Sequence, residues 1–137
     1  MITKQMKSLA TRYYNLSLKL TNHCRNFLSE LLKANNGIID WEDVELPSYV
    51  SVCYDGGNHP EYASNVFSEV YGVMLEDDGD IYLHIEDCEE YPISSITVDE
   101  LYNICDFIDK YAKEMNINIP KDDLYWDEEN KKIILQL

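Results

Sequence analysis

The first 34 residues carry the strongest folding signal in the chain. Apolar side chains recur every three or four residues, which places them on one face of an α-helix. These residues are Met6, Leu9, Tyr13, Leu16, Leu20, Cys24, Phe27 and Leu31. The Asn-Asn-Gly sequence at 35–37 is a typical helix stop. An unbroken helix over residues 4–34 would be about 45 Å long, more than a small domain needs. We therefore expect it to break near residues 21–22, to lie along a sheet, or to project.

A projecting helix would favour a homodimer. Four stripe residues are spaced by seven, as in a coiled coil: Met6, Tyr13, Leu20 and Phe27. However, His23 and Glu30 interrupt this seam with polar side chains. Packing of the helix on a sheet is therefore favoured, and a structural homodimer through this helix remains the alternative.

A second helix has a clear start. Thr97 and Glu100 have the spacing of a capping box, in which each side chain binds the other residue's backbone N–H. The residues that follow have helical periodicity: Leu101, Ile104, Cys105, Ile108, Ala112 and Met115. The pattern predicts a helix over about 98–116 that packs on the sheet.

The intervening segments read as antiparallel strands. Asp78-Gly79 separates two β-rich runs, 70–76 and 81–86, which predicts a hairpin. A two-residue turn there would pair Met74 with Leu83 on the core face, with His84 as a surface or bridging residue on the other face. Further strands are expected at 49–55 and, as a second hairpin, at 124–137. The fold class is α+β: one domain over 1–137, with an antiparallel sheet of four to six strands.

Charge divides the chain into a basic helical arm and an acidic body. Residues 1–36 contain six Lys or Arg and one Glu, a net charge of +5. Residues 37–137 contain 25 Asp or Glu and five Lys, a net charge of −20. Such a body repels nucleic acid and anionic membranes and attracts basic proteins. We therefore expect a basic protein partner, with no direct nucleic-acid binding and no membrane.

Motif searches favour a protein without catalytic activity or cofactor. The chain contains no phosphate-binding glycine loop, Gly-x-Ser-x-Gly, His-Glu-x-x-His or dinucleotide fingerprint. Its four widely spaced cysteines indicate free thiols rather than disulfides or a zinc site. No apolar run approaches the roughly 18 residues of a membrane span, and no apolar segment typical of a signal peptide follows the first residues. We expect a cytoplasmic protein.

The densest group of recognition residues lies at 52–62. Gly-Gly at 56–57 permits a sharp turn after a strand, and Pro60 restricts the residue before it, so this loop should be shaped. Shaped loops on a rigid scaffold often carry function. The candidate binding residues are Tyr54, Asp55, Asn58, His59, Glu61 and Tyr62. An alternative is a small enzyme or metal-binding protein centred on this loop, with Asp55, His59 and Glu61 as ligands or acid–base groups; turn chemistry alone also explains these residue types.

The same region carries a resemblance. The run Tyr-Asp-Gly-Gly-Asn-His-Pro-Glu-Tyr-Ala-Ser-Asn at 54–65, continuing through Val-Tyr-Gly-Val at 70–73 and Asp-Glu-Leu-Tyr at 99–102, resembles small acidic proteins of gut Bacteroidetes and their mobile elements. The similarity covers about residues 50–110. That group has no assigned activity, so the resemblance implies a cellular context, mobile elements or phage defence, and no chemistry.

Together these observations favour a non-enzymatic interaction protein. In this hypothesis the acidic body engages a basic partner as an adaptor or inhibitor, and the loop at 52–62 provides specificity. In a special case, the acidic surface would mimic DNA phosphates and block a defence enzyme. The small enzyme and the helix-mediated homodimer remain the alternatives.

Overall fold

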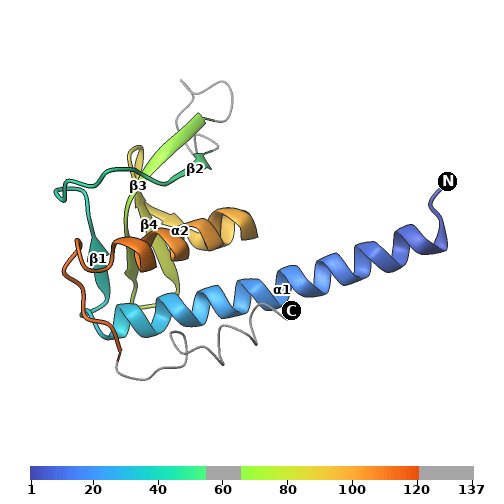
Figure 1. The fold of residues 1–137 in the computed structure, drawn as a ribbon, viewed down its shortest axis with the longest axis horizontal. Coiled ribbons are helices and arrows are strands. Elements are labelled where there is room, and N and C mark those ends of the chain that lie inside the picture. Colours follow the sequence, from blue (N-terminus) through green and yellow to red (C-terminus); the bar gives the residue numbers. More distant parts are fainter. Residues whose placement is uncertain (55–65, 121–137) are drawn as a thin grey trace.

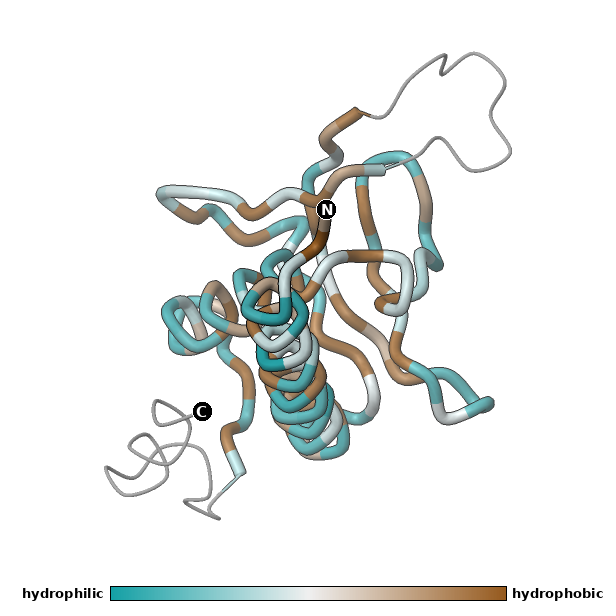
Figure 2. The backbone as a smooth tube through the Cα atoms, turned by 90° about the vertical axis from the view of Figure 1, so that its right-hand side faces the viewer, coloured by the Kyte–Doolittle hydropathy of each residue, from teal (hydrophilic) through white to brown (hydrophobic). Residues whose placement is uncertain are grey.

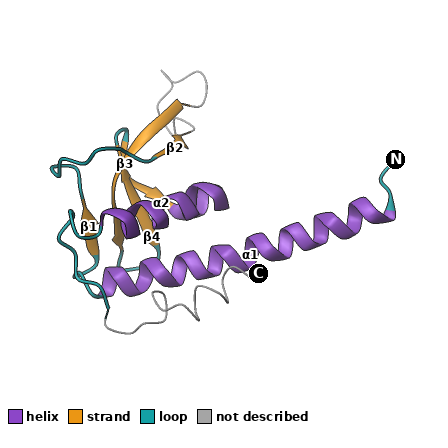
Figure 3. Cartoon of the chain, viewed as in Figure 1, coloured by secondary structure: helices purple, strands orange, loops and turns teal. Residues whose placement is uncertain are grey.

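A computed structural model describes residues 1–54 and 66–120 of the chain. It confirms the α+β fold, with a long first helix, five antiparallel strands and a second helix (Figures 1 and 3). The elements in chain order are α1 (Lys4–Lys33), β1 (Ile38–Asp40), β2 (Ser51–Tyr54), β3 (Val66–Leu75), β4 (Ile81–Ile85), β5 (Cys88–Pro92), the 3₁₀ turn η1 (Ile93–Ser95) and α2 (Val98–Tyr111). The predicted hairpin at 124–137 lies outside the described residues.

Helix α1 is continuous, so the expected break at 21–22 is wrong. The Oγ1 atom of Thr3 caps its N-terminus by accepting a hydrogen bond from the backbone N–H of Met6 (3.0 Å). Thr21 does not act as a cap, because its hydroxyl donates to the carbonyl of Ser17 one turn earlier (2.8 Å). This bond satisfies the hydroxyl inside the helix and leaves the backbone ladder intact.

The predicted stop of α1 is confirmed. Asn36 has a φ of 62°, and the N–H of Gly37 donates back to the carbonyl of Leu32 (2.7 Å), which closes the last turn. Asn35 then joins the ends of both helices. Its side-chain oxygen accepts from the N–H of Asn118 (2.7 Å), and its amide donates to the carbonyl of the same residue (2.8 Å).

Helix α2 begins as predicted, but its regular part ends earlier than predicted. Both hydrogen bonds of the capping box between Thr97 and Glu100 are present. The helix is regular over Val98–Tyr111 rather than 98–116. A further turn follows and ends at Asn116, whose positive φ of 55° stops the helix as Asn36 does in α1.

The sheet is organised around β3. The strand order is β1-β3-β4-β5, and β2 pairs with the first residues of β3. Helix α2 lies beside the C-terminal half of α1 (Figure 1), and the view along α1 in Figure 2 shows the two helices side by side. Both contribute to one core with the sheet. The most deeply buried apolar side chains of the helices and strands are Leu28, Leu31, Leu32, Ile39, Val52, Val70, Val73, Leu83, Ile85, Ile104 and Ile108. No helix in the described part of the chain is long and apolar enough to cross a membrane.

Strands β3 and β4 form the predicted hairpin, but the predicted register is wrong by one residue. Met74 pairs with Tyr82 rather than with Leu83, and Val73 takes the place opposite Leu83. Because side chains alternate between the faces of a strand, this shift puts Val73 rather than Met74 in the core.

The hairpin loop explains the shift. The N–H of Glu76 donates to the carbonyl of Asp80 (3.0 Å), which leaves three residues in the loop instead of two. Gly79, at the third position, has a φ of +84°, as in a turn followed by a left-handed residue. The side chain of Asp78 supports this turn by accepting from the N–H of Asp80 (2.9 Å). Both loop types use Asp-Gly, so the dipeptide alone does not distinguish them.

Candidate functional site

The predicted loop site is mostly outside the described residues. Asp55, Asn58, His59, Glu61 and Tyr62 lie in the undescribed segment 55–65, and their proposed role stays a prediction. Their neighbour at the end of β2 is Tyr54, which is 2% exposed and packs edge-on against Tyr91, with ring centroids 5.2 Å apart. Its ring is part of the core.

A group of polar and aromatic side chains does come together where β1 ends on β3. Strand β3 contains a bulge there: Val70 faces Ile85 and Gly72 faces His84, so Tyr71 is an extra residue. A bulge re-aims the side chain at its position. The ring of Tyr71 accordingly lies edge-on to the imidazole of His84, with centroids 5.4 Å apart.

Gly72 allows side chains of β1 and β4, which flank β3, to meet across it. Asp40 on β1 and His84 on β4 are both cross-strand partners of Gly72. A Cβ atom at this position would lie 2.7 Å from the carbonyl oxygen of Ile39 and 2.9 Å from Oδ2 of Asp40. The missing side chain therefore opens the path along which the carboxylate of Asp40 reaches the imidazole of His84.

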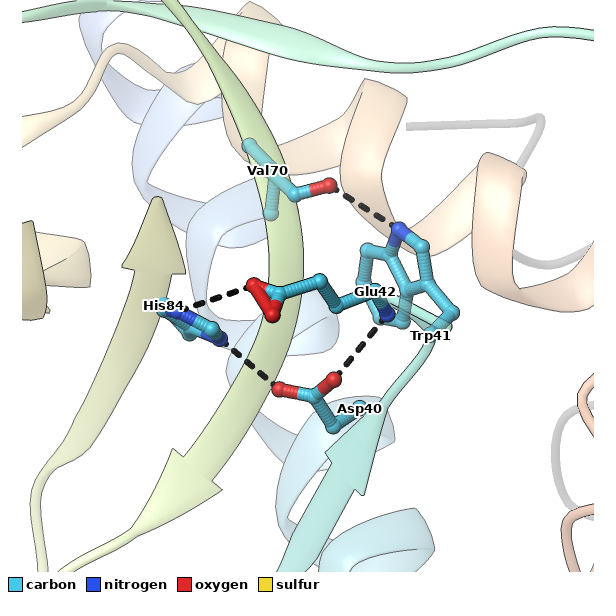
Figure 4. Close-up of polar contacts among 5 residues, drawn as sticks. All are labelled: Asp40, Trp41, Glu42, Val70 and His84. Atoms are coloured by element: carbon cyan, nitrogen blue, oxygen red, sulfur yellow. Dashed lines mark hydrogen bonds and ion pairs between the residues drawn. The ribbon is translucent and has the colours of Figure 1, made fainter. Parts of the chain in front are cut away.

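His84 is held between two carboxylates (Figure 4). Its Nδ1–H donates to Oδ2 of Asp40 (2.8 Å), and its Nε2 lies 3.6 Å from Oε2 of Glu42. The other oxygen of Asp40 accepts from the backbone N–H of Glu42 (3.0 Å), which fixes the turn after β1. The hydrogen bond from Nδ1 ties β1 to β4, and Glu42 adds a second negative charge beside the ring.

Trp41, between these two acids, anchors the bulge from the core side. Its backbone N–H donates to the carbonyl of Tyr71 (2.7 Å), and its indole Nε1–H donates to the carbonyl of Val70 (2.9 Å). The ring is 4% exposed and packs against Phe107 of α2, with centroids 5.5 Å apart. One residue, through its backbone N–H and its indole, therefore satisfies the irregular backbone of β3 and packs it against α2.

A shallow recess opens beside this anchor. We call it the Trp41 recess; it is lined by Trp41, Glu42, Val44, Leu46, Ser48, Tyr49, Glu69, Tyr71 and Phe107. Its volume of about 80 Å³ is small beside the roughly 300–1,000 Å³ of pockets that hold drug-sized ligands. The recess therefore suits the end of one side chain better than a whole substrate. Its walls combine aromatic rings with two carboxylates.

The electrostatic environment of the recess is negative. Desolvation raises the pKa of the Tyr71 phenol, and four carboxylates raise it further: Glu69, Glu86, Glu42 and Asp87. The negative charge of these four carboxylates disfavours a group that gains negative charge here and favours a cation.

The cysteines and the potential metal ligands give weaker evidence for a functional site. The four cysteines are free, as predicted, and the Sγ atom of Cys105 lies 3.8 Å from the carbonyl of Cys24 inside the core. Within residues 1–54 and 66–120, no three His, Cys, Asp or Glu side chains gather as metal ligands would.

Sequence reasoning missed Trp41, Glu42 and Tyr71. The one available signal was Gly72, because a glycine inside a β-rich run often marks a bulge or a close backbone approach. The sequence matches no protein family, curated protein or solved structure.

Proposed function

We propose that the protein is a non-enzymatic interaction protein whose acidic body binds a basic segment of a partner protein. In this proposal the Trp41 recess receives one Lys or Arg side chain of that segment. The observation that carries the proposal is the combination of Glu42 and Glu69 with aromatic rings in a recess of side-chain size.

The surrounding charge supports a basic partner. The described body, residues 37–54 and 66–120, contains 18 Asp or Glu and two Lys. A field of this sign attracts cationic segments over long distances, and added salt weakens the attraction. Within the recess, cation–π contact with Tyr71 or Tyr49 would add about 0.5–2 kcal/mol. The long-range field would bring the partner in, and the recess would select its side chain.

A peptide titration tests this proposal. We expect a tri-arginine peptide to bind the full chain at low salt in calorimetry, and the matching citrulline peptide, which has nearly the same shape without the charge, not to bind. Replacing the recess acids (Glu42→Gln with Glu69→Gln) should weaken arginine-peptide binding about tenfold, or about 1.4 kcal/mol.

The matched control removes two charges at the hairpin turn (Glu76→Gln with Asp80→Asn). If this pair weakens binding as much as the recess pair does, binding depends on net charge alone and the recess has no special role. If the wild type binds arginine and citrulline peptides equally, a cation is not what the body recognises.

A further inference from the structure

The N-terminal half of α1 is largely uncovered: within residues 1–54 and 66–120, Leu20 is its one apolar side chain that packs on the core, and it does so only in part. Buried side chains of α1 begin at Cys24, and the helix before it projects away from the body (Figure 1). Helices α1 and α2 run in the same direction, and Cys24 lies against Cys105. Because α2 begins at Val98, seven residues before Cys105, its support ends near Ser17 of α1. We call residues 4–20 the free half.

The free half exposes an apolar stripe. Met6 is 53% exposed, Leu9 52%, Tyr13 68% and Leu16 41%. At 3.6 residues per turn, this stripe continues the face whose later residues are buried against the body. A helix face that is apolar along its whole length, but covered along only half of it, indicates a second packing surface for the free half.

The free half also has a clean coiled-coil pattern. Met6 and Tyr13 occupy one seam position, and Leu9 and Leu16 the other. Leu20, the next residue of the first position, is partly buried against its own body. The two polar residues that interrupt the seam, at 23 and 30, lie in the half of α1 that packs on its own body. They therefore do not count against pairing of the free halves.

The charge distribution favours a second copy of this chain as the partner of the stripe, and it favours an antiparallel orientation of the two helices. Residues 4–20 contain four Lys or Arg and no acid, whereas the described body has 18 acids and two Lys. Parallel pairing of two α1 helices would place two acidic bodies side by side. Antiparallel pairing separates the bodies and brings each basic helix end to the other copy's body, near the acidic first turn of α2.

We propose that the free half of α1 binds the free half of a second copy of this chain in an antiparallel, two-fold pair, stripe against stripe. The contact would be about 26 Å long, from 17 residues at 1.5 Å each. A two-helix contact of this length falls in the class of small, reversible interfaces, so we expect a dimer that dissociates at micromolar concentration. This inference goes beyond the proposed function and does not depend on the recess.

Light scattering and sedimentation equilibrium of the full chain test the proposal. Between about 1 µM and about 200 µM, where interfaces of this size exchange, the average mass should rise from 16.0 kDa towards twice that value. Replacing two stripe residues (Leu9→Gln with Leu16→Gln) should raise the dimer dissociation constant at least tenfold. Both residues are exposed, so circular dichroism should show an unchanged helix content.

The matched control replaces two exposed residues of the same helix that lie off the stripe (Tyr14→Gln with Leu18→Gln), which are 66% and 49% exposed. Its dissociation constant should stay within twofold of the wild type. A wild type that remains monomeric at about 200 µM, or a control that dissociates as readily as the stripe variant, would overturn the pairing.

The salt dependence of dimerisation distinguishes the antiparallel from the parallel orientation. Lipid vesicles test whether the stripe binds a membrane surface instead. Added salt should weaken an antiparallel dimer, because it screens attraction between basic ends and acidic bodies, and it would strengthen a parallel one. A dimer that tightens with salt therefore refutes the antiparallel arrangement. If the chain is monomeric and sediments with phosphatidylserine vesicles through the same stripe residues, the occupant is a membrane surface and the proposal is wrong.

Discussion

Substituting Gly72 by alanine should destabilise the fold by steric crowding rather than by backbone strain. Its φ is not in the left-handed region, unlike those of Gly37 and Gly79. The added Cβ would lie 2.7 Å from the carbonyl oxygen of Ile39 and 3.0 Å from the Cα atom of Asp40. Both atoms belong to the backbone of β1, so no flexible side chain can move aside to relieve the contact.

The magnitude follows from three contributions. An extra methyl group in a packed site costs about 1–3 kcal/mol. Displacement of Asp40 from His84 costs about 0.5–1.5 kcal/mol for the lost hydrogen bond. Reduced freedom of the unfolded chain returns about 0.4–1 kcal/mol. We therefore expect Gly72→Ala to lower the free energy of unfolding by about 2 kcal/mol, with a fall in Tm of about 6–10 °C.

Urea denaturation followed by circular dichroism measures this change, with an unaltered m-value as the check that both states are comparable. His84→Gln isolates the hydrogen bond, and the double variant should lose less than the sum of the two single changes, because both remove the same contact. Gly79→Ala is the backbone control: nothing lies within 4 Å of its added Cβ, and only its positive φ should matter. If the free energy of unfolding of Gly72→Ala lies within about 0.5 kcal/mol of the wild-type value, crowding against β1 does not make this position intolerant of a side chain.

Three further predictions concern single side chains. Glu100→Ala should lower the free energy of unfolding by about 1–3 kcal/mol in the same denaturation assay, because its carboxylate completes the capping box and also accepts from a backbone N–H of β2 (2.7 Å); an effect under about 0.5 kcal/mol would contradict this double role. The hydrogen bond to Asp78 raises the pKa of Tyr82 to about 12, so its stabilising contribution is present below the unfolded pKa of about 10 and is lost as pH rises through 12. In an ultraviolet tyrosinate titration, Tyr82→Phe should remove one of the late-titrating tyrosines, and an unchanged late phase would disprove the bond. Leu28→Ala, at a fully buried site of α1, should cost about 2–5 kcal/mol by thermal denaturation, whereas Leu9→Ala in the free half should change stability by under about 0.5 kcal/mol; similar losses at both sites would mean that the free half packs on its own body.

Features set by neighbouring residues were predictable from the sequence, and features set by distant residues were not. The start of α2 and the stop of α1 were predictable, because a cap such as Thr97 or a left-handed residue such as Asn36 acts within one turn of the chain. The hairpin was predictable for the same reason, but its register was not. Asp78-Gly79 fits both a two-residue and a three-residue loop, and the choice depends on which face of β3 the core covers.

The candidate site was beyond sequence reasoning because its parts meet only through the sheet. Asp40, Gly72 and His84 are far apart in the chain and become neighbours through strand pairing. Trp41 lies near them because the bulge at Tyr71 leaves carbonyl groups for it to satisfy.

The sequence by itself determined that the chain forms a long apolar-faced helix and an acidic α+β body, because periodicity, capping and charge are properties of neighbouring residues. Only the tertiary structure decided how much of α1 the body covers. That length depends on where α2 begins beside α1, at Val98, and no local pattern within α1 contains this information. The uncovered half of α1 follows from that packing, and the Trp41 recess follows from the pairing of β1 with β3. The two functional proposals rest on these two features.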